Sequence, residues 1–588
     1  MTIDVLPAEK TTLQSPTQPE KPWIASYDAH VPASLKPYPR KTLVDVVNGT
    51  ARERPNHPAF LFKGATINYA RFQQESDAFA VGLSALGVKP GDRVALLIPN
   101  TPQFIIAEFG AWKAGAIVVP LNPLYTEREL KHALNHTETK VVVALTPFYG
   151  KIKALQSETS VQQVIATNIK EYLPGMLRFL FTLFKEKKEG HRIALETGDA
   201  WMQDVIRQHR DAHPPNVRIN PDDPALLMFT GGTTGVPKAA VITHQNVIFT
   251  AMQIKAWFGE MLVDWEDVIL ALMPMFHIYG QAGVAATGFM GHHPLALVPN
   301  PRDIDDVLTT IHKSRPAFLP GVPTLFIAMM RHPDVQAGKA DLSSLKLCIA
   351  GAAPLLYETK QRFEELTGGH LVEAYALTES TCTGGMTPVL GRYKPGAVGL
   401  PFPDVDLRIV DVETGEQTLP LGEMGEITIH APQLMAGYWQ QPEETAQTIR
   451  KINGERWLYT GDIGFLDEDG YLHIVDRKKD VIKPSGFQVW PREVEEIIAS
   501  HPAVSEVGVI GVPDAYQGEA VKAFVVLHPG QTLTEEELRA WCKSQLAAYK
   551  VPRYVEFCPD LPKSTVGKIL RRELRKQDKE TLNVPMNG

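Results

Sequence analysis

The chain has 588 residues, of which 44% are hydrophobic and 21% are charged, and its formal net charge at pH 7 is -8. A chain of this length exceeds what one hydrophobic core usually supports, so we expect more than one domain. The acidic balance argues against a general nucleic-acid-binding protein. The 4 cysteines show no zinc-ligand spacing, and we interpret them as reduced thiols: Cys348, Cys382, Cys542 and Cys558.

The first segment, residues 1–39, is rich in Pro, Thr, Gln and Glu, which predicts a loosely ordered tail. It has no apolar signal-peptide core, and no run in the chain reaches the roughly 18 apolar residues of a membrane span. We therefore expect a cytoplasmic protein. The segment 171–188 joins a short apolar helix to a basic cluster. This pattern favours equally a peripheral contact with the inner face of the membrane and a helix packed on the domain core.

Between residues 40 and 476, apolar strand-like runs alternate with helical patterns, which predicts an α/β domain with largely parallel sheets. Thr126 and Glu129 have the spacing of a capping box, so a helix is expected to begin there. Ligands of such folds bind beyond the carboxyl ends of the strands. Three apolar runs near the start are strand candidates: Arg93–Ile98, Ala116–Pro120 and Val141–Leu145.

The pattern changes after Ala397, where shorter strands such as Leu407–Val410 and Glu426–His430 are separated by turn residues, which predicts a small β-rich subdomain. A charge run then interrupts the apolar pattern at 475–480, and we assign a domain boundary there. Residues 481–577 are expected to form a separate α+β domain, followed by a tail at 578–588. Its predicted helices are Glu493–Ser500 and Thr534–Leu546, and its predicted strands are Val504–Gly511 and Ala520–Leu527.

The most informative segment is Leu227–Lys238, in which an apolar strand leads into a Gly/Thr loop. Glycines let the backbone approach a polyphosphate closely, and threonines add hydroxyl donors. Lys238 adds a positive charge. The loop differs from that of the common nucleotide triphosphatases because Pro237 directly precedes the lysine and no Ser or Thr follows it. The loop residues that we expect to contact phosphate are Thr230, Gly231, Gly232, Thr233 and Thr234.

The order of residues in this loop closely resembles the phosphate-loop signature of the adenylate-forming (acyl-activating) enzymes, a family that includes acyl-CoA synthetases, aryl-CoA ligases and luciferases. Further parts of the signature follow in order. Gly351 and Ala352 resemble the adenine-side turn of the family. In the matching Tyr375–Glu379 segment, the resemblance implies that Tyr375 stacks near adenine and that Thr378 meets the phosphate. Glu379 would help to hold Mg²⁺, together with Thr230.

One departure from the family concerns Ala374 and Ala376, where glycine is usual. An added methyl group is small, so we expect a slightly altered nucleotide wall rather than a lost site. Asp462 resembles the aspartate that binds both ribose hydroxyls, and Arg477 matches the arginine that adds to this grip. Two further matches, Lys483 and Gln488, resemble contacts to the adenylate.

Lys568 matches the adenylation lysine of the family, and Lys479 matches the hinge residue, which assigns residues 477–480 to a hinge. The resemblance implies an N-terminal domain of two doubly wound subdomains plus the β-rich one, followed by a small mobile lid. It also implies that the carboxylate of an acid attacks ATP to form an acyl-adenylate, and that CoA then takes the acyl group. The implied catalytic residues are Lys568, Thr230, Glu379 and His277.

Among members of this family, the chain looks closest to bacterial long-chain fatty-acid CoA ligases, on segments such as Asn122–Leu130 and Gly321–Phe326. His277 matches the aromatic–histidine pair beside the acyl pocket. The implied small-molecule partners are a fatty acid, ATP and CoA, and a homodimer is left open. Three alternatives also remain open: a ligase for aryl or medium-chain acids, an acyl-AMP ligase that serves a carrier protein, and a non-catalytic nucleotide binder.

Overall fold

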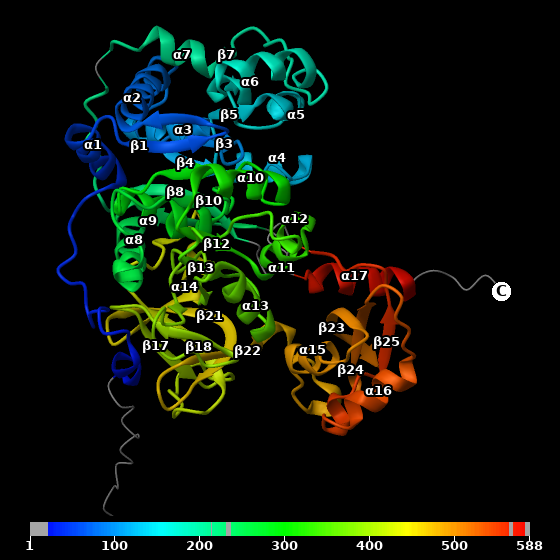
Figure 1. The fold of residues 1–588 in the computed structure, drawn as a ribbon. Coiled ribbons are helices and arrows are strands. Elements are labelled where there is room, and N and C mark those ends of the chain that lie inside the picture. Colours follow the sequence, from blue (N-terminus) through cyan, green and yellow to red (C-terminus); the bar gives the residue numbers. More distant parts are fainter. Residues whose placement is uncertain (1–20, 213, 231–236, 515, 564–568, 583–588) are drawn as a thin grey trace, which may run out of the picture.

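The computed structural model describes residues 21–212, 214–230, 237–514, 516–563 and 569–582 (Figure 1). The predicted site residues Gly231, Gly232, Thr233, Thr234 and Lys568 lie outside the described residues. The α/β class is confirmed, with a large N-terminal domain and a small C-terminal domain. Four free cysteines are present, as expected from their spacing.

The first sheet of the N-terminal domain has 8 described strands in the order β19-β9-β8-β4-β3-β5-β6-β7. Its centre is parallel and every residue of β5 is buried, because helices cover both faces. Thr126 and Glu129 form the predicted capping box at the start of α4 (Glu127–His136). The strands are β3 (Arg93–Leu97), β4 (Ile117–Pro120), β5 (Val141–Leu145), β6 (Gln163–Thr167), β7 (Ala200–Trp201), β8 (Pro224–Thr230), β9 (Lys238–Thr243) and β19 (Gly437–Tyr438).

The second sheet has 14 described strands and is larger than the sequence pattern indicated. The strands of the expected β-rich subdomain continue this sheet instead of forming a separate one, because β15 and β16 pair onto the edge of β14. At the other edge, β1 pairs with β11 through Phe60 and Leu295. The strands are β1 (Pro58–Phe62), β2 (Ala65–Asn68), β10 (Ile269–Ala271), β11 (Leu295–Leu297), β12 (Phe318–Gly321), β13 (Leu347–Ala350), β14 (His370–Tyr375), β15 (Gly385–Met386), β16 (Ala397–Pro401), β17 (Asp406–Val410), β18 (Gly425–His430), β20 (Ile449–Ile452), β21 (Glu455–Leu466) and β22 (Leu472–Arg477).

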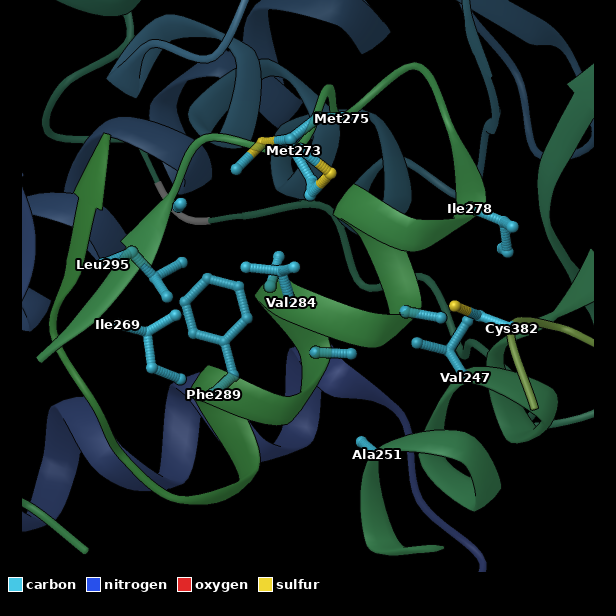
Figure 2. Packing of buried hydrophobic residues seen from close by; sticks show 14 of the residues in the cluster. Val247, Ala251, Ile269, Met273, Met275, Ile278, Val284, Phe289, Leu295 and Cys382 are labelled. Carbon is cyan, nitrogen blue, oxygen red and sulfur yellow. The ribbon is translucent and has the colours of Figure 1, made fainter. Parts of the chain in front are cut away.

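Helices fill the space around and between the two sheets. All of α3 (Pro102–Lys113) is buried, and α2 (Tyr69–Ala85) packs against it. Figure 2 shows buried apolar side chains of α8 (His244–Phe258) and α9 (Thr287–Met290) gathered with those of β10 and β11, Phe289 lying beside Ile269 and Leu295. Other helices are α1 (Leu43–Glu53), α5 (Thr146–Gln156), α7 (Met202–Gln208), α10 (Ile304–Ser314), α11 (Pro323–Arg331), α12 (Pro333–Gln336), α13 (Tyr357–Thr367) and α14 (Pro442–Thr448).

Residues 21–39 pack against the β-rich part of the second sheet, although their composition favours a loose tail. Trp23 is only 5% exposed, in a short 3-10 helix at Pro22–Ser26. The Tyr27 hydroxyl donates to the Pro401 carbonyl at 2.7 Å, and the Tyr38 hydroxyl donates to Asp404 at 2.8 Å. The buried aromatic rings explain this order, because composition alone does not reveal which few side chains find a partner.

The C-terminal domain has its own hydrophobic core and stands to one side of the large domain (Figure 1). Its 3-stranded sheet contains β23 (Val504–Asp514), β24 (Gly518–Leu527) and β25 (Tyr554–Phe557). Two of its helices are α15 (Pro491–Ala499) and α17 (Arg571–Leu582). A third, α16 (Glu535–Lys543), is capped by Thr534, the predicted first residue of the helix, and ends before the predicted Leu546.

The segment 171–188 forms α6 (Gly175–Leu180), which continues into a π-helical turn at Phe181–Lys185. No residue of α6 is buried, and only Phe181 of the following turn packs inward. The alternative of a helix packed on the domain core is therefore wrong. In the part of the chain that the structure describes, no helix combines the length and apolar character needed to cross a membrane.

Candidate functional site

The predicted phosphate loop connects two strands that pair with each other. Strands β8 and β9 are antiparallel neighbours, and Thr230 stands directly opposite Lys238 in their register. The residues at the two ends of the loop are therefore held together by the strand pairing. Lys238 forms an ion pair with Glu444 at the start of α14, and its Nζ atom lies 5.2 Å from the ring centroid of Tyr438.

Tyr438 connects this strand pair to the predicted metal-site glutamate. Strand β19 pairs with β9, which brings Tyr438 opposite Ala240. The Tyr438 hydroxyl donates to Glu379 Oε1 at 2.8 Å. Burial, followed by the charge of Glu379, raises the pKa of Tyr438, so this hydroxyl keeps its proton and remains a donor. Thr230, Lys238 and Glu379 thus belong to one neighbourhood.

A second cluster joins three predicted residues on β14, β21 and β22. Asp462 is 6% exposed; it accepts a hydrogen bond from the Tyr375 hydroxyl at 2.7 Å and pairs with Arg477 Nε at 3.2 Å. Burial and the adjacent carboxylate raise the pKa of Tyr375 well above its usual value. Gly461, just before Asp462, has φ 70°, a left-handed conformation that favours glycine.

The predicted adenine-side turn follows β13, next to β14 in the sheet. The Gly351 N–H donates to the Gly321 carbonyl at 3.1 Å, and a Cβ atom on Gly351 would lie 3.3 Å from the ring of Tyr279. Ala352 has φ 67°, a strained value for a residue with a side chain, and such strain is frequent at functional sites. Ala374 is partly exposed on β14. These residues form the end of the parallel strands, where ligands of such sheets bind.

Thr378 and Ala376 lie on the loop that follows β14. Thr378 is partly exposed and Ala376 is exposed, so both are accessible to a ligand. The carbonyl of Thr378 accepts the Thr381 N–H at 3.0 Å, which fixes the turn that leads through Glu379.

His277 follows a loop that Asn100 holds in place. No signal in the sequence indicates this role for Asn100. The buried amide of Asn100 donates to the Met273 carbonyl at 2.8 Å and accepts the Met275 N–H at 2.9 Å. Burial lowers the pKa of His277 to about 4, so its ring is neutral at pH 7. Its Nδ1 atom lies 3.3 Å from the Tyr279 N–H, which assigns the ring proton to Nε2. Figure 2 shows the apolar side chains of Met273 and Met275 beside this region.

The predicted hinge residue Lys479 lies in a short 3-10 turn, Lys478–Asp480, directly after β22. Burial, with a smaller contribution from the nearby Arg477, lowers the pKa of Lys479 to about 8. Lys483 and Gln488 are exposed on the C-terminal domain, and the Lys483 N–H donates to Glu519 of that domain at 2.6 Å. Among the described residues, no contact brings Lys483 or Gln488 to the Tyr375 cluster.

Three residues of this region are missing from the sequence-based set: Asn100, Tyr438 and Glu444. Tyr438 and Glu444 flank the start of α14, where a proline at the first helical position and an acidic first turn form a helix-start signal. That signal predicts a helix but says nothing of the long-range contact with Glu379. Asn100 carries no local signal, because its function depends on a loop far along the chain.

The two clusters together can hold a polyanion that carries a hydroxylated ring. Lys238 lies at one end, and the buried carboxylate of Asp462 lies at the other. Among the described residues, no group of three His, Cys, Asp or Glu side chains is arranged to hold a metal ion. The Glu379 carboxylate is a hard oxygen ligand, and a small number of protein ligands fits Mg²⁺ that is bound mainly through substrate phosphates.

Comparisons with known proteins agree with this geometry. A family model described as "AMP-binding enzyme" matches residues 47–439, and one described as "AMP-binding enzyme C-terminal domain" matches residues 493–568. A long-chain-fatty-acid--CoA ligase of Bacillus subtilis is 39% identical over 96% of this chain and 100% of its own length. One from Escherichia coli O6:H1 is 39% identical over 95% of this chain and 98% of its own length.

A solved structure, an ATP-bound RpMatB-BxBclM chimera, is 30% identical and superposes with a TM-score of 0.80, covering 92% of this chain and 99% of the chimera. The shared fold, the two matched domains and the near-complete coverage of the relatives have one explanation: this chain is a member of the AMP-binding enzyme family.

Proposed function

We propose that the protein is a long-chain fatty acid:CoA ligase, which converts ATP, a fatty acid and CoA into acyl-CoA, AMP and pyrophosphate. The proposal is supported by relatives that carry this name and align over nearly their whole length. It is supported equally by the site, which has the donors and charges needed to bind a nucleoside triphosphate.

The observation that carries the proposal is the position of the segment Tyr375–Glu379. At one end Tyr375 bonds to Asp462, and at the other end Glu379 bonds to Tyr438 beside the strand pair that carries Lys238. One short loop therefore links a ribose-type acceptor to a phosphate-type cradle. A nucleotide laid along this loop would meet both sites at once, which supports ATP as the ligand.

In the first half-reaction, the acid carboxylate attacks the α-phosphorus of ATP and pyrophosphate leaves, which yields the acyl-adenylate. The carboxylate is already a nucleophile, so no general base is required. In our proposal Thr230 and Lys238 bind the phosphates, together with residues 231–234 of the loop. An incoming phosphate would compete with Glu444 for Lys238. The proposed role of Lys568 is to stabilise the charge that develops in the transition state.

The proposal includes Mg²⁺, for which Glu379 and Thr230 would provide protein oxygen atoms. When bound, the ion would neutralise phosphate charge. Tyr438 would keep the Glu379 carboxylate oriented by its hydrogen bond. The neutral His277 would remain beside the acyl chain without adding a charge to an apolar pocket.

In the second half-reaction, the CoA thiol attacks the acyl carbon of the adenylate, the thioester forms and AMP leaves. We propose that the C-terminal domain turns about the hinge at 477–480 between the two half-reactions, and that Lys483 and Gln488 reach the nucleotide in one of the two positions. Their exposure, and the absence of a contact with the Tyr375 cluster among the described residues, support such a movement. A peripheral contact with the membrane is also proposed, since a long-chain acid partitions into lipid.

The decisive experiment is a substrate panel with purified protein. Pyrophosphate release and thioester formation are measured with palmitate, octanoate and coumarate, each with and without CoA. We expect palmitoyl-CoA to form with the highest kcat/KM. Preference for octanoate or coumarate would overturn the chain-length assignment, adenylate without thioester would indicate an acyl-AMP ligase, and no pyrophosphate release would reject the enzyme proposal.

The role of Lys568 is tested by Lys568→Ala. We expect adenylation to fall by orders of magnitude while ATP binding, followed by calorimetry, changes little, because a transition-state contact adds little to ground-state affinity. Lys543→Ala, which alters a lysine elsewhere in the same domain, serves as the control. Adenylation by Lys568→Ala within about threefold of wild type would reject the assignment.

A further inference from the structure

The surface of α6 and the turn after it is unusual for a protein in water. Four side chains of this segment are more than half exposed: Met176 at 72%, Phe179 at 59%, Leu183 at 59% and Phe184 at 71%. Leu177 and Leu180 are exposed at 42% and 41%. A surface helix normally turns its apolar stripe towards the core, and here the stripe points outwards.

The segment is fixed in this orientation by contacts at its base. Phe181 packs edge-on against the buried His191, with ring centroids 5.3 Å apart. The buried Glu186 pairs with Lys170 and accepts a hydrogen bond from the Asn168 amide at 3.1 Å. Arg178 pairs with Glu171 at 2.7 Å. The apolar face is thus built into the fold and is not a loose end of the chain.

A basic border adjoins the apolar face. Between residues 170 and 192 the basic residues outnumber the acidic ones, whereas the whole chain has a net charge of -8. Lys187 and Lys188 are exposed, and the Lys185 and Arg192 side chains are exposed at 65% and 60%. Exposed apolar residues next to lysines and arginines are typical of proteins that insert shallowly into anionic membranes.

We propose that α6 and the following turn, residues 175–188, form the docking surface of this protein for an anionic lipid bilayer. Phe179, Leu183 and Phe184 enter the acyl region, and the side chains of Lys187 and Lys188 reach the lipid phosphates. The inference rests on the proposed function in one respect only, namely that the substrate is a lipid-soluble fatty acid. The surface itself is defined by exposure and charge.

Two other partners for this apolar face, a second copy of the chain and the C-terminal domain, are less compatible with the same observations. In a two-fold symmetric dimer the patch would meet itself, and the Lys187 and Lys188 borders would repel each other. In the arrangement that Figure 1 shows, the C-terminal domain lies well away from α6, so it does not cover the patch there. A bilayer satisfies the apolar face and the basic border together.

The test is flotation of the full-length protein with lipid vesicles in the absence of ATP and CoA. Phe179→Ser/Leu183→Ser/Phe184→Ser is compared with Leu390→Ser/Met424→Ser, which changes exposed apolar residues elsewhere. We expect the triple variant to lose at least about tenfold in binding to vesicles of phosphatidylglycerol and phosphatidylcholine, and the control to bind like wild type. Lys187→Glu/Lys188→Glu should weaken binding to these vesicles but not to pure phosphatidylcholine.

A second measurement locates the contact directly. A polarity-sensitive dye on Leu183→Cys should shift its emission to the blue when anionic vesicles are added, and the same dye on Leu390→Cys should not. Unchanged flotation of the triple variant, or no shift at Leu183→Cys, would overturn the proposal, as would a wild-type dimer that the triple variant dissociates without any vesicle binding. Because octanoate activation requires no membrane, an intact rate in every variant separates this outcome from failure of the proposed ligase function.

Discussion

Arg571 and Asp476 meet across the boundary between the two domains, with Arg571 Nη1 2.7 Å from Asp476 Oδ1. Arg571 also pairs with Glu495 of α15 at 2.7 Å and with Asp480 in the turn at 3.3 Å. Among the three partners of Arg571 that the described part of the chain provides, only Asp476 precedes Lys479. Arg571 begins α17, shortly after Lys568, so the helix that follows the proposed catalytic lysine is fastened to the last strand of the large domain.

Asp476→Asn should therefore loosen the two domains. Asp476 also accepts the Arg492 N–H at 2.6 Å and the Arg477 N–H at 2.7 Å, so an asparagine amide would face three donors with one acceptor atom. We expect the loss of about 1–3 kcal/mol of interdomain stabilisation. Limited proteolysis between residues 477 and 490 should speed up by about fivefold or more, since 1.4 kcal/mol corresponds to a factor of ten.

The matched control is Glu535→Gln, which alters a pair with Arg539 at 3.8 Å within α16 and leaves the boundary untouched. Equal cleavage rates in wild type and Asp476→Asn would show that the Arg571 contact does not hold the domains in this arrangement.

Tyr438→Phe should raise the Mg²⁺ concentration needed for half-maximal adenylation. The change removes one hydrogen bond to Glu379 and keeps the ring beside Lys238, so the carboxylate is less well oriented but still present. A rise of about tenfold is expected, with kcat recovering at saturating Mg²⁺. Tyr471→Phe, which removes a hydroxyl bonded to the Arg392 carbonyl, is the control. A lower kcat with an unaltered Mg²⁺ requirement would contradict the positioning role.

Asp462→Asn should weaken the binding of ATP and abolish the discrimination between ribose and 2′-deoxyribose nucleotides. If Asp462 accepts hydrogen bonds from both ribose hydroxyls, the wild-type protein distinguishes ATP from 2′-deoxy-ATP and the variant does not. The KM for ATP should rise by about tenfold or more, because a charged acceptor of a hydrogen bond is replaced by a weaker one. Asp469→Asn, at an exposed loop, is the control. Equal discrimination in both enzymes would remove Asp462 from the ribose site.

Glu108 gives a pH-dependent prediction. It is 2% exposed on α3, the Gln281 amide donates to it at 2.6 Å, and burial raises its pKa to about 8. Below the unfolded pKa of 4.5 both states are protonated, and between 4.5 and 8 only the unfolded chain is ionised. Ionisation of the unfolded state alone favours unfolding, so wild type loses stability as the pH rises through this range.

Glu108→Gln removes the ionisation and keeps the size of the side chain. At pH 8 the variant should be more stable than wild type by about 2–4 kcal/mol, and the difference should shrink towards pH 5. Thermal unfolding at both pH values measures this, with the exposed Glu416→Gln as the control. A difference that does not change with pH would show that Glu108 is ionised in the folded protein.

Local signals in the sequence predicted much of this fold. The apolar run Val141–Leu145 is recognisable as a buried parallel strand, and the Thr126 capping box fixes the start of a helix. Long-range pairing left no such signal. The contact of Phe60 with Leu295 joins residues far apart in the chain, and the bond of Tyr438 to Glu379 depends on how β19 docks. The outward orientation of the apolar side chains of α6 could not be predicted from the sequence either, because an apolar helix has the same composition whether it packs on a core or faces the solvent.

The continuity of the second sheet determines how this enzyme should melt. Strand β14, which carries Tyr375, is joined through β15 and β16 to β22, which carries Arg477, so a single hydrogen-bonded ladder supports the proposed adenine side and the proposed ribose side. Local fraying at either edge propagates along that ladder, whereas the three-stranded sheet beyond the hinge has no strand in common with it. On heating, nucleotide binding should therefore be lost in one cooperative transition, and the C-terminal domain should unfold in a separate transition.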